Sequence, residues 1–499
     1  MTEERGREAE ILAARRASLE RLRAAGVEPF ALGFDQTDLA VDLHAAHADL
    51  AAGEDADHRA QVAGRVVLAR RHGKLTFLVL RDRTGDIQLF CEEATLGDAY
   101  ALLEEIDLGD IVGAAGTITR TKRGELSVKV ESVTMLTKAL RPLPEKWHGL
   151  QDPDLQQRQR YLHLIADELP RKYVLARAAV LKTMRGILDD RGFVEFEGPT
   201  LQSVAGGANA RPFTTHHLAL DVPMKLRISL ELYLKRMAVG GIERIYELGR
   251  IFRNEGIDRD HNPEFTMLEA YQAYGDYETM MELSESLVAA CARAVNPIMG
   301  RPRETLTVDV AGQQIDLTPP FERLTMLDAV SKATGEQITL DRSDLHAIAA
   351  RNDVPVEEAM GSGMVVRELF DKLVEPTLVR PTFVCDFPRD VSPLARVHRS
   401  DPGLTEHFDL VAAGIELVTA FSELTDPDDQ RARFELQQQM REVLGDEAHP
   451  LDEDFLRALE HGMPPMGGLG MGIDRLLLLL TDAQSLRDLI MFPQHRPVV

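Results

Sequence analysis

The sequence has 499 residues, which is long enough for two or three domains and a large hydrophobic core. Its formal net charge of -24 argues against a protein that binds nucleic acid through its overall charge, but it leaves room for a local basic patch. The three cysteines, Cys91, Cys291 and Cys385, form no CxxC pair and have no metal-binding spacing. This usage excludes a disulfide-rich secreted scaffold and predicts three buried thiols in a reduced, cytoplasmic protein.

The chain begins with charged residues rather than an apolar segment, so no secretory signal is expected. No later apolar run reaches the roughly 20 residues of a membrane helix, so no membrane partner is expected either. Residues 8–25 carry apolar side chains at helical spacing and are followed by Gly26, which predicts an amphipathic helix within an N-terminal extension over residues 1–58. Its arginines would either contact a polyanion or lie on a solvated helix face.

Between residues 59 and 140 the pattern changes to five short alternating strands separated by turns, which predicts a small barrel of the OB-fold type. OB barrels commonly stack single-stranded bases on aromatic side chains above a basic groove, and Phe77 and Phe90 are candidate platforms. The alternative for either ring is a place in the barrel core. A proline-containing linker over residues 141–160, with Trp147, marks a domain boundary near residue 145.

Two helical patterns, over residues 158–168 and 170–192, precede a predicted strand that ends at Pro199. By pattern alone this is an ordinary helix–strand unit. Residues 300–380 predict mostly helices and one short hairpin, and they indicate little about function.

A hairpin is predicted from strands over Glu243–Arg253 and Glu264–Ala273, joined by a polar loop. Residues two apart in a strand project on the same side, so one face of the second strand carries four side chains of mixed chemistry. These residues are Phe265, Met267, Glu269 and Tyr271. Together with Arg253, at the junction of strand and loop, they suit a ligand with a flat ring, an anion and a cation. The alternative is a half-exposed hairpin with solvated charges.

A second hairpin is predicted within HFDLVAAGIELVTAFSEL, with its turn centred on Ala412-Ala413 or on Ala413-Gly414. Either turn places Asp409 and Glu416 on one face, directly opposed or diagonal, where like charges repel unless something positive lies between them. Carboxylate oxygens suit Mg²⁺, which usually bridges to substrate phosphates. The alternative is a solvated hairpin with two harmless acids.

The stretch GMPPMGGLGMGIDRLLLLLTD predicts a glycine-rich strand followed by a helix that begins near Ile473. Glycines allow close approach of a ligand, and Arg475 in the first helical turn would point at it. A P-loop is excluded because no GxxxxGK[ST] occurs.

Several of these stretches carry a resemblance to a known family. Arg253-Asn254-Glu255, His261 and Phe265 resemble the FRxE...HxxxF motif of class II aminoacyl-tRNA synthetases, and GLGMGIDR resembles their third motif. The runs GGANARPFTTHH, ELYLKRM, RNEGIDRDHNPEFTMLEAY and FPQHRPV are similar to bacterial lysyl-tRNA synthetases. The resemblance covers nearly the whole chain.

The resemblance implies an α+β fold, in which an N-terminal OB-fold β-barrel for the anticodon precedes a class II synthetase antiparallel sheet flanked by helices. The catalytic domain would span residues 161–499, with an insertion at about residues 300–380. The reaction implied is activation of L-lysine with ATP to lysyl-adenylate and transfer of the lysyl group to the terminal adenosine of tRNA(Lys). The resemblance also implies Mg²⁺ and a homodimer whose interface contains the unit ending at Pro199.

The resemblance further implies a role for individual residues. The catalytic residues would be Arg253, Glu255 and Arg475. The ATP site would comprise Arg253, Glu255, His261, Phe265, Asp409, Glu416 and Arg475, with Asp409 and Glu416 holding Mg²⁺. The lysine site would comprise Gly207, Glu231, Glu269, Tyr271, Thr419, Phe421 and Glu423, and the anticodon would meet Phe77 and Gln88.

The chain departs from the family pattern in three places. Leu218 stands where the family usually has Asn, Thr419-Ala420 stands for an Asn-Gly pair, and the loop over residues 71–74 is shorter. A paralogue that activates another cationic amino acid, or that lysylates a protein, is one rival reading, although such protein ligases lack the barrel. A catalytically silent tRNA-binding regulator is another, and the complete set of ATP-site residues argues against it.

Overall fold

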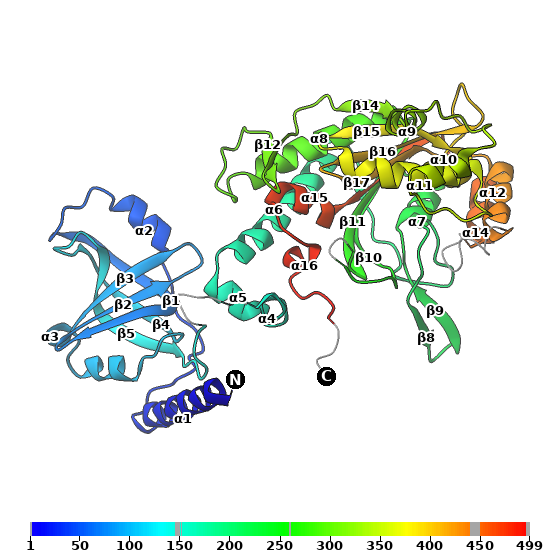
Figure 1. The fold of residues 1–499 in the computed structure, drawn as a ribbon. Helices are drawn as coiled ribbons and strands as arrows, with labels where there is room; N and C mark the ends of the chain where they lie inside the picture. The colour runs from blue at the N-terminus through cyan, green and yellow to red at the C-terminus, as the bar shows by residue number, and fades with distance from the viewer. Residues whose placement is uncertain (1, 145–149, 151, 259–260, 440–449, 496–499) are drawn as a thin grey trace. The chain divides into compact units, whose positions relative to one another are not determined.

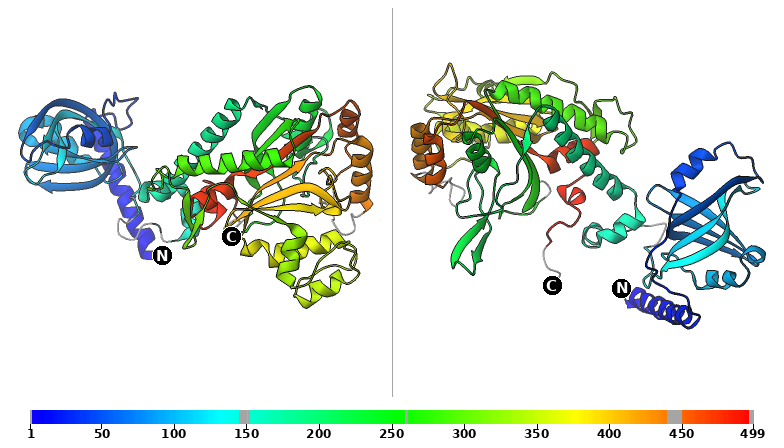
Figure 2. Two further views of the ribbon diagram at one scale, coloured as in Figure 1. Left: turned by 90° about the horizontal axis from the view of Figure 1, so that it is seen from above. Right: turned by 180° about the vertical axis from the view of Figure 1, so that it is seen from behind.

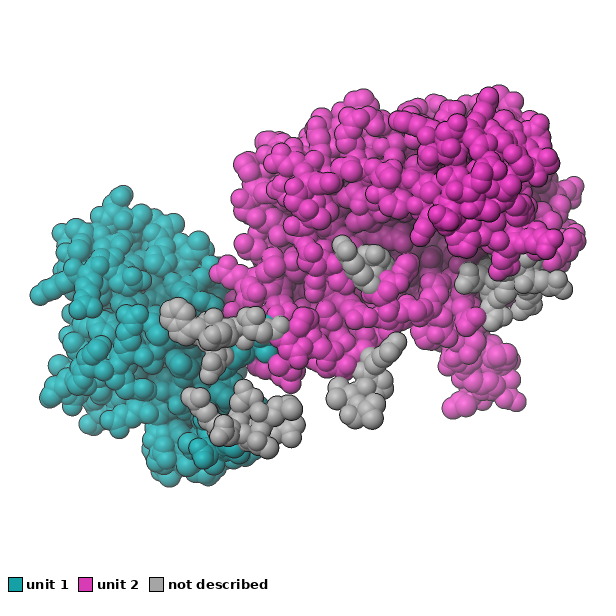
Figure 3. Space-filling model, in the orientation of Figure 1, with its two compact units in different colours: residues 1–151 teal, residues 152–499 magenta. Residues whose placement is uncertain are grey.

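The structure is a computed structural model, and it describes residues 2–144, 150, 152–258, 261–439 and 450–495. Contacts divide the chain into two compact units, residues 1–151 and 152–499 (Figure 3). The predicted linker residue Trp147 and the end of FPQHRPV lie outside the described residues.

The first unit contains the predicted closed five-stranded barrel, with strand order β1-β2-β3-β5-β4 (Figure 1). The strands are β1 (Asp55–His72), β2 (Leu75–Arg81), β3 (Asp86–Glu92), β4 (Ile111–Arg120) and β5 (Leu126–Thr137). In β2 and β3 buried and half-buried residues alternate, because a strand places successive side chains on opposite faces. Leu78, Leu80 and Leu89 therefore fill the core, whereas Phe77 lies on the outer face.

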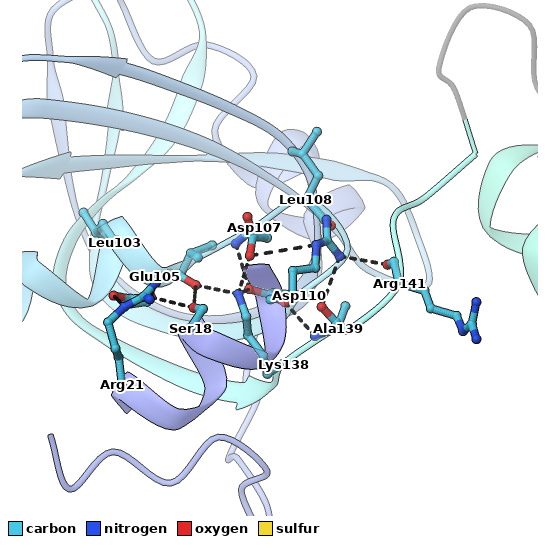
Figure 4. A network of polar contacts seen from close by, with 12 residues as sticks. Ser18, Arg21, Leu103, Glu105, Asp107, Leu108, Asp110, Lys138, Ala139 and Arg141 are labelled. Atoms are coloured by element: carbon cyan, nitrogen blue, oxygen red, sulfur yellow. Dashed lines mark hydrogen bonds and ion pairs between the residues drawn. The ribbon is translucent and has the colours of Figure 1, made fainter. Parts of the chain in front are cut away.

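The helices of this unit are α1 (Thr2–Ala24), α2 (Ala40–Ala46), α3 (Glu93–Leu96) and η1 (Gly97–Glu105). Polar contacts fix α1 to the barrel unit (Figure 4). Arg15 donates to the carbonyl groups of Leu108, Ala139 and Arg141, and Arg21 pairs with Glu105. Two arginines of the predicted amphipathic helix are thus engaged within the unit.

The second unit is built on an eight-stranded sheet of order β14-β15-β16-β17-β18-β11-β10-β6. It is antiparallel except at the pairs β14–β15 and β6–β10. Its strands are β6 (Val194–Glu195), β10 (Arg244–Phe252), β11 (Glu264–Ala273), β14 (Glu322–Thr325), β15 (Thr382–Pro388), β16 (Leu404–Ala412), β17 (Ile415–Ser422) and β18 (Met466–Gly472). Smaller sheets contain β7 (Leu201–Gln202), β8 (Thr214–His217) and β9 (Val222–Leu226), and β12 (Thr307–Val310) with β13 (Gln313–Asp316).

Helices cover this sheet (Figures 1 and 2). The helices of this unit are α4 (Pro153–Arg158), α5 (Arg160–Ala166), α6 (Leu169–Asp190), α7 (Glu231–Val239), α8 (Tyr277–Val295), α9 (Met326–Thr334), α10 (Leu345–Arg351), α11 (Ser362–Leu373), η2 (Glu375–Thr377), η3 (Arg389–Val391), α12 (Pro427–Gln439), α14 (Glu453–Glu460), α15 (Ile473–Thr481) and α16 (Leu486–Leu489). One face packs on α6, α8 and α15 through residues such as Leu268 and Ala270. Met267, Glu269 and Tyr271 therefore project from the opposite face, as their alternation with these core residues requires.

The two predicted hairpins are present. β10 and β11 pair from Arg244–Gln272 to Phe252–Glu264. The turn of the second hairpin is Ala413-Gly414, where both residues have positive φ angles of 55° and 67°, as a tight hairpin turn requires. A register shift follows, so that Asp409 lies opposite Thr419 and is diagonal to Glu416. The strand predicted to end at Pro199 is shorter than expected, because only Val194 and Glu195 pair with β10.

Cys91, Cys291 and Cys385 are free and buried, as predicted. Among the helices formed by the described residues, none combines the length and the apolar character needed to cross a membrane.

Candidate active site

Two adjoining cavities lie over the face of the eight-stranded sheet from which Met267, Glu269 and Tyr271 project. The larger has a volume of about 870 Å³ and is bordered by the loop after β10 and by the start of α15. The second, of about 420 Å³, is the acidic cavity, which is lined by the buried side chains of Glu231, Glu269 and Glu423 among others. Both cavities share Arg253, Glu416 and Thr419, among other residues, so a ligand in one would meet a ligand in the other beside the guanidinium of Arg253.

The larger cavity is lined by the aromatic ring of Phe265 and by the cationic side chains of Arg253 and Arg475, among other residues. The guanidinium of Arg253 lies 5.2 Å from the centre of the Phe265 ring, and burial lowers the pKa of Arg253. Arg475 extends from α15 and donates to Glu416 Oε1 at 3.2 Å. All but one of the residues predicted for ATP line this cavity, namely Arg253, Glu255, His261, Phe265, Glu416 and Arg475, and Asp409 does not.

The start of α15 is tied to the neighbouring strand by Asp474. Its carboxylate accepts a hydrogen bond from the backbone N–H of Thr266 at 2.8 Å and pairs with Arg177 of α6. These contacts hold the first turn of α15, and hence Arg475, against β11. Sequence reasoning did not identify Asp474 or Arg177, because their contact joins residues 297 positions apart.

The smaller cavity brings together every residue predicted for lysine. These are Gly207, Glu231, Glu269, Tyr271, Thr419, Phe421 and Glu423. Gly207 has a φ of +89°, and a side chain there would place its Cβ 2.8 Å from Ser229 Oγ. The position therefore favours glycine for both its backbone conformation and its space.

A buried lysine, Lys235, lies beneath this cavity. Its ammonium contacts Glu231 and lies 2.5 Å from Glu423 Oε2, and its side chain is fully buried. Burial alone would lower the pKa of Lys235, but the two carboxylates outweigh burial and raise it, so the ammonium stays charged. The sequence carried a signal for this pair, since Glu231 and Lys235 are four residues apart on a helix.

Glu269 is the carboxylate of this cavity that has no cationic partner among the contacts described. It accepts hydrogen bonds from Ser229 Oγ and from the Leu230 N–H, both at 2.9 Å, and from the Tyr271 hydroxyl at 3.1 Å. Burial, with the charge of Glu231 as a second cause, raises the pKa of Glu269 to about 7. Burial also raises the pKa of Glu423 to about 8, so a cationic ligand would favour the ionised forms of both carboxylates.

Asp409 and Glu416, which were predicted to hold Mg²⁺, are not arranged to bind an ion between them. Asp409 is only 2% exposed, and its Oδ2 accepts from Arg367 Nη1 at 2.9 Å. Its Oδ1 contacts the Thr419 hydroxyl and lies 3.1 Å from His407 Nε2. Within the part of the chain that the structure describes, no three acidic, His or Cys side chains converge as a metal site. The positive group between the two acids is an arginine from α11.

Thr419 and Phe421 lie on β17 at the edge of the acidic cavity. The Thr419 hydroxyl donates a hydrogen bond to Asp409. The ring of Phe421 packs edge-on against that of His407, with the ring centres 4.6 Å apart. Ser392 Oγ lies 2.7 Å from the other ring nitrogen of His407. A chain of contacts therefore orients Asp409 toward α11.

The barrel presents a separate surface in the first unit. Phe77 and Phe90 are cross-strand partners on its outer face, with ring centres 5.4 Å apart. Gln88 is next along this face and donates to Ser127 Oγ at 2.9 Å. Both rings are half-buried and pack against each other outside the barrel core.

Comparisons with known proteins cover both units. The family of class II tRNA synthetases (D, K and N) matches residues 152–496, and the OB-fold nucleic acid binding domain matches residues 60–136. A lysine–tRNA ligase of Synechococcus sp. (strain CC9311) is 52% identical over 480 residues, which is 95% of this chain and 97% of that protein. The lysine–tRNA ligases of Moorella thermoacetica and Bacillus subtilis (strain 168) are 48% and 46% identical, covering 98% and 97% of this chain and the same shares of their own lengths. The nucleotide-sized cleft, the acidic cavity beside it and these near full-length relatives agree, and the chain belongs to the lysine–tRNA ligase family of class II aminoacyl-tRNA synthetases.

Proposed function

We propose that this protein activates lysine with ATP and transfers the lysyl group to tRNA(Lys). The observation that carries the proposal is the acidic cavity, which opens onto a nucleotide-sized cleft at Arg253. A lysine in the acidic cavity and ATP in the larger cavity would place the lysine carboxylate and the α-phosphate beside the guanidinium of Arg253. Holding two reactants in this way supplies much of the acceleration in phosphoryl transfer.

In the first step, a lysine carboxylate oxygen bonds to the α-phosphorus of ATP while the bond to the β-phosphate breaks, which gives lysyl-adenylate and pyrophosphate. Arg253 would hold the carboxylate and the α-phosphate, where negative charge concentrates in the transition state. The adenine would lie between Phe265 and Arg475, with Glu255 at its edge. His261 would contact the triphosphate tail, and no side chain has to act as a nucleophile.

The charge of the acidic cavity supports lysine as the substrate. Glu231, Glu269 and Glu423 face one protein ammonium, that of Lys235. A bound lysine brings two further ammonium groups, so three carboxylates would then face three cations. Glu231 and Gly207 would receive the α-amino group, and Glu423, Glu269 and Tyr271 would surround the ε-ammonium.

In the second step, a hydroxyl of the terminal adenosine of tRNA attacks the lysyl carbonyl carbon and AMP leaves. Recognition of the tRNA would come from the barrel, where Phe77 would stack on an anticodon base and Gln88 would read a base edge. The proposal thus assigns tRNA recognition to the predicted anticodon-binding domain, residues 59–140. It assigns both chemical steps to the predicted catalytic domain, residues 161–499.

Three further properties belong to this proposal: a cytoplasmic location, Mg²⁺ carried with ATP, and a homodimer. Glu416, unlike Asp409, lines the larger cavity, where it would face an ion carried by ATP. The dimer proposal is supported by large apolar side chains exposed along α5, α6, β6 and β7. These are Tyr161, Leu169, Val174, Leu175, Val194 and Leu201.

Aminoacylation with purified components tests the proposal. Radiolabelled lysine should become acid-precipitable in the presence of ATP and tRNA(Lys), and tRNA for another amino acid is the control. A protein-lysylating paralogue would label protein and not tRNA, and a silent tRNA-binding regulator would label neither.

A further inference from the structure

Arg367 lies among three carboxylates at the border of the acidic cavity. Its Nε lies 2.7 Å from Asp371 Oδ1, its Nη1 lies 2.9 Å from Asp409 Oδ2, and its Nη2 lies 3.8 Å from Glu416 Oε2. Each nitrogen of the guanidinium thus faces a different acid. Arg367 belongs to the segment in which the sequence pattern indicated little about function.

The surroundings hold this guanidinium in place. Asp371 is one helical turn further along α11, and the rings of Phe387 and Phe370 lie 5.2 Å and 5.9 Å from the guanidinium carbon. The side chain is 26% exposed, and the exposed part lines the acidic cavity together with Arg253 and Glu416. An arginine does not lose its proton in proteins, so this charge is permanent.

We propose that Arg367 is a built-in cation that takes the place of a divalent ion between Asp409 and Glu416. The proposal deepens the proposed function, because it assigns a positioning residue to the site where lysine and ATP would meet. Two acids on one face of a hairpin require a positive group between them, and the guanidinium meets that requirement before any substrate arrives.

The coordination chemistry of Mg²⁺ explains why the ion would not also enter. Mg²⁺ needs oxygen ligands at about 2.1 Å in near-octahedral geometry. Asp409 already contacts Arg367, His407 and Thr419, so both of its oxygens are engaged. An ion that displaced Arg367 would also leave a guanidinium close to a second positive charge.

Titration of the full-length enzyme with Mn²⁺ alone tests this assignment, with free Mn²⁺ followed by electron paramagnetic resonance. Arg367→Ala removes the cation that Asp371, Asp409 and Glu416 face, so these acids can close on an ion and the variant should gain one Mn²⁺ site at least tenfold tighter than any site of the wild type. The double variant Arg367→Ala/Asp409→Asn should lose that site. Arg367→Lys keeps a positive charge at the position and should bind Mn²⁺ as the wild type does.

The wild type and Asp409→Asn provide a comparison that does not depend on the folding of Arg367→Ala. Equal Mn²⁺ binding by these two proteins is expected, since no ion bridges Asp409 in the wild type. Weaker binding by Asp409→Asn would overturn the proposal, as would a folded Arg367→Ala that gains no site. These titrations contain no ATP, lysine or tRNA, so their outcome is separate from that of the aminoacylation assay.

Discussion

Glu423 directly follows β17 and faces Lys235 and the cavity proposed for the lysine side chain. Glu423→Gln keeps the shape of the side chain and removes its charge. Because breaking a buried ion pair from one side costs about 3 to 5 kcal/mol, we expect lysine kcat/KM to fall by about 100-fold or more. The KM for ATP should change much less, since Arg253, Phe265 and Arg475 are untouched.

Glu406→Gln is the matched control for this substitution. Glu406 is also a buried acid with a cationic partner, Arg399, but it lines neither the nucleotide cavity nor the acidic cavity. Pyrophosphate exchange kinetics should therefore separate the two variants. A folded Glu423→Gln enzyme with lysine kcat/KM within a few fold of the wild type would contradict the proposed pocket.

Glu269 predicts a pH dependence for lysine binding. Its pKa is about 7 in the free protein, and an ammonium ligand favours the ionised carboxylate, so lysine should bind better as pH rises through 7. For one coupled proton the KM for lysine should fall about tenfold between pH 6 and pH 8. Burial raises the pKa of Glu423, in the same cavity, to about 8, so Glu269→Gln should weaken this dependence and move it toward pH 8. A flat KM in the wild type would refute the assignment.

The same raised pKa fixes the sign of its effect on stability. Folding raises the pKa of the Glu269 carboxyl group from 4.5 to about 7, so the folded protein favours the protonated form. Its contribution to the stability of the free protein is present below the unfolded pKa and is lost as pH rises toward 7. Lysine, by pairing with the carboxylate, should offset this loss, so the increase in Tm on adding lysine should grow over this pH range.

The chemistry at individual positions was only partly predictable from the sequence. Strand alternation predicted that Glu269 and Tyr271 share a face, because that rule is local. Arg367 could not be assigned from local pattern, since its partners Asp409 and Glu416 come from a distant hairpin. The resemblance named the acids, and the tertiary structure showed which cation lies between them.

At the scale of elements, the barrel carries its own prediction. Phe77→Ala removes one of two paired rings on the outer face of β2 and β3, and stacking of a base on an aromatic ring is worth about 1 to 3 kcal/mol. The affinity for tRNA(Lys) should therefore fall roughly 5- to 150-fold, measured at a salt concentration where binding is specific. Lysine activation without tRNA should remain unchanged.

Phe30→Ala provides a control within the same unit, since Phe30 is 42% exposed and lies outside the paired rings. It should leave tRNA affinity close to that of the wild type. Equal affinities for Phe77→Ala and the wild type, with the barrel folded, would remove Phe77 from the interface.

Element types followed from the sequence more closely than element lengths. The barrel strands, both hairpins and the glycine-rich strand before α15 carry alternation or turn residues that act locally. The strand after α6 was predicted to reach Pro199 but pairs only at Val194 and Glu195. The length of this strand depends on how many of its residues pair with β10, which the local sequence pattern does not determine.

At the scale of the whole molecule, the exposed apolar side chains of α5, α6 and β6 predict self-association. Sedimentation equilibrium should give twice the 55.5 kDa of one chain. Leu175→Glu places a charge on a residue that is 57% exposed and should shift the protein toward monomers. Val379→Glu, at an exposed position of another region, should leave the mass unchanged, and a monomeric wild type would refute the dimer.

Lysine-dependent exchange of pyrophosphate into ATP tests the central claim most directly, because it needs only the two cavities and no tRNA. The assay should be run with each of the twenty common amino acids under identical conditions. The account predicts a strong signal with lysine, since its two ammonium groups balance the acids of the cavity and its carboxylate would reach Arg253. No exchange with lysine, together with a strong signal from another amino acid, would contradict it.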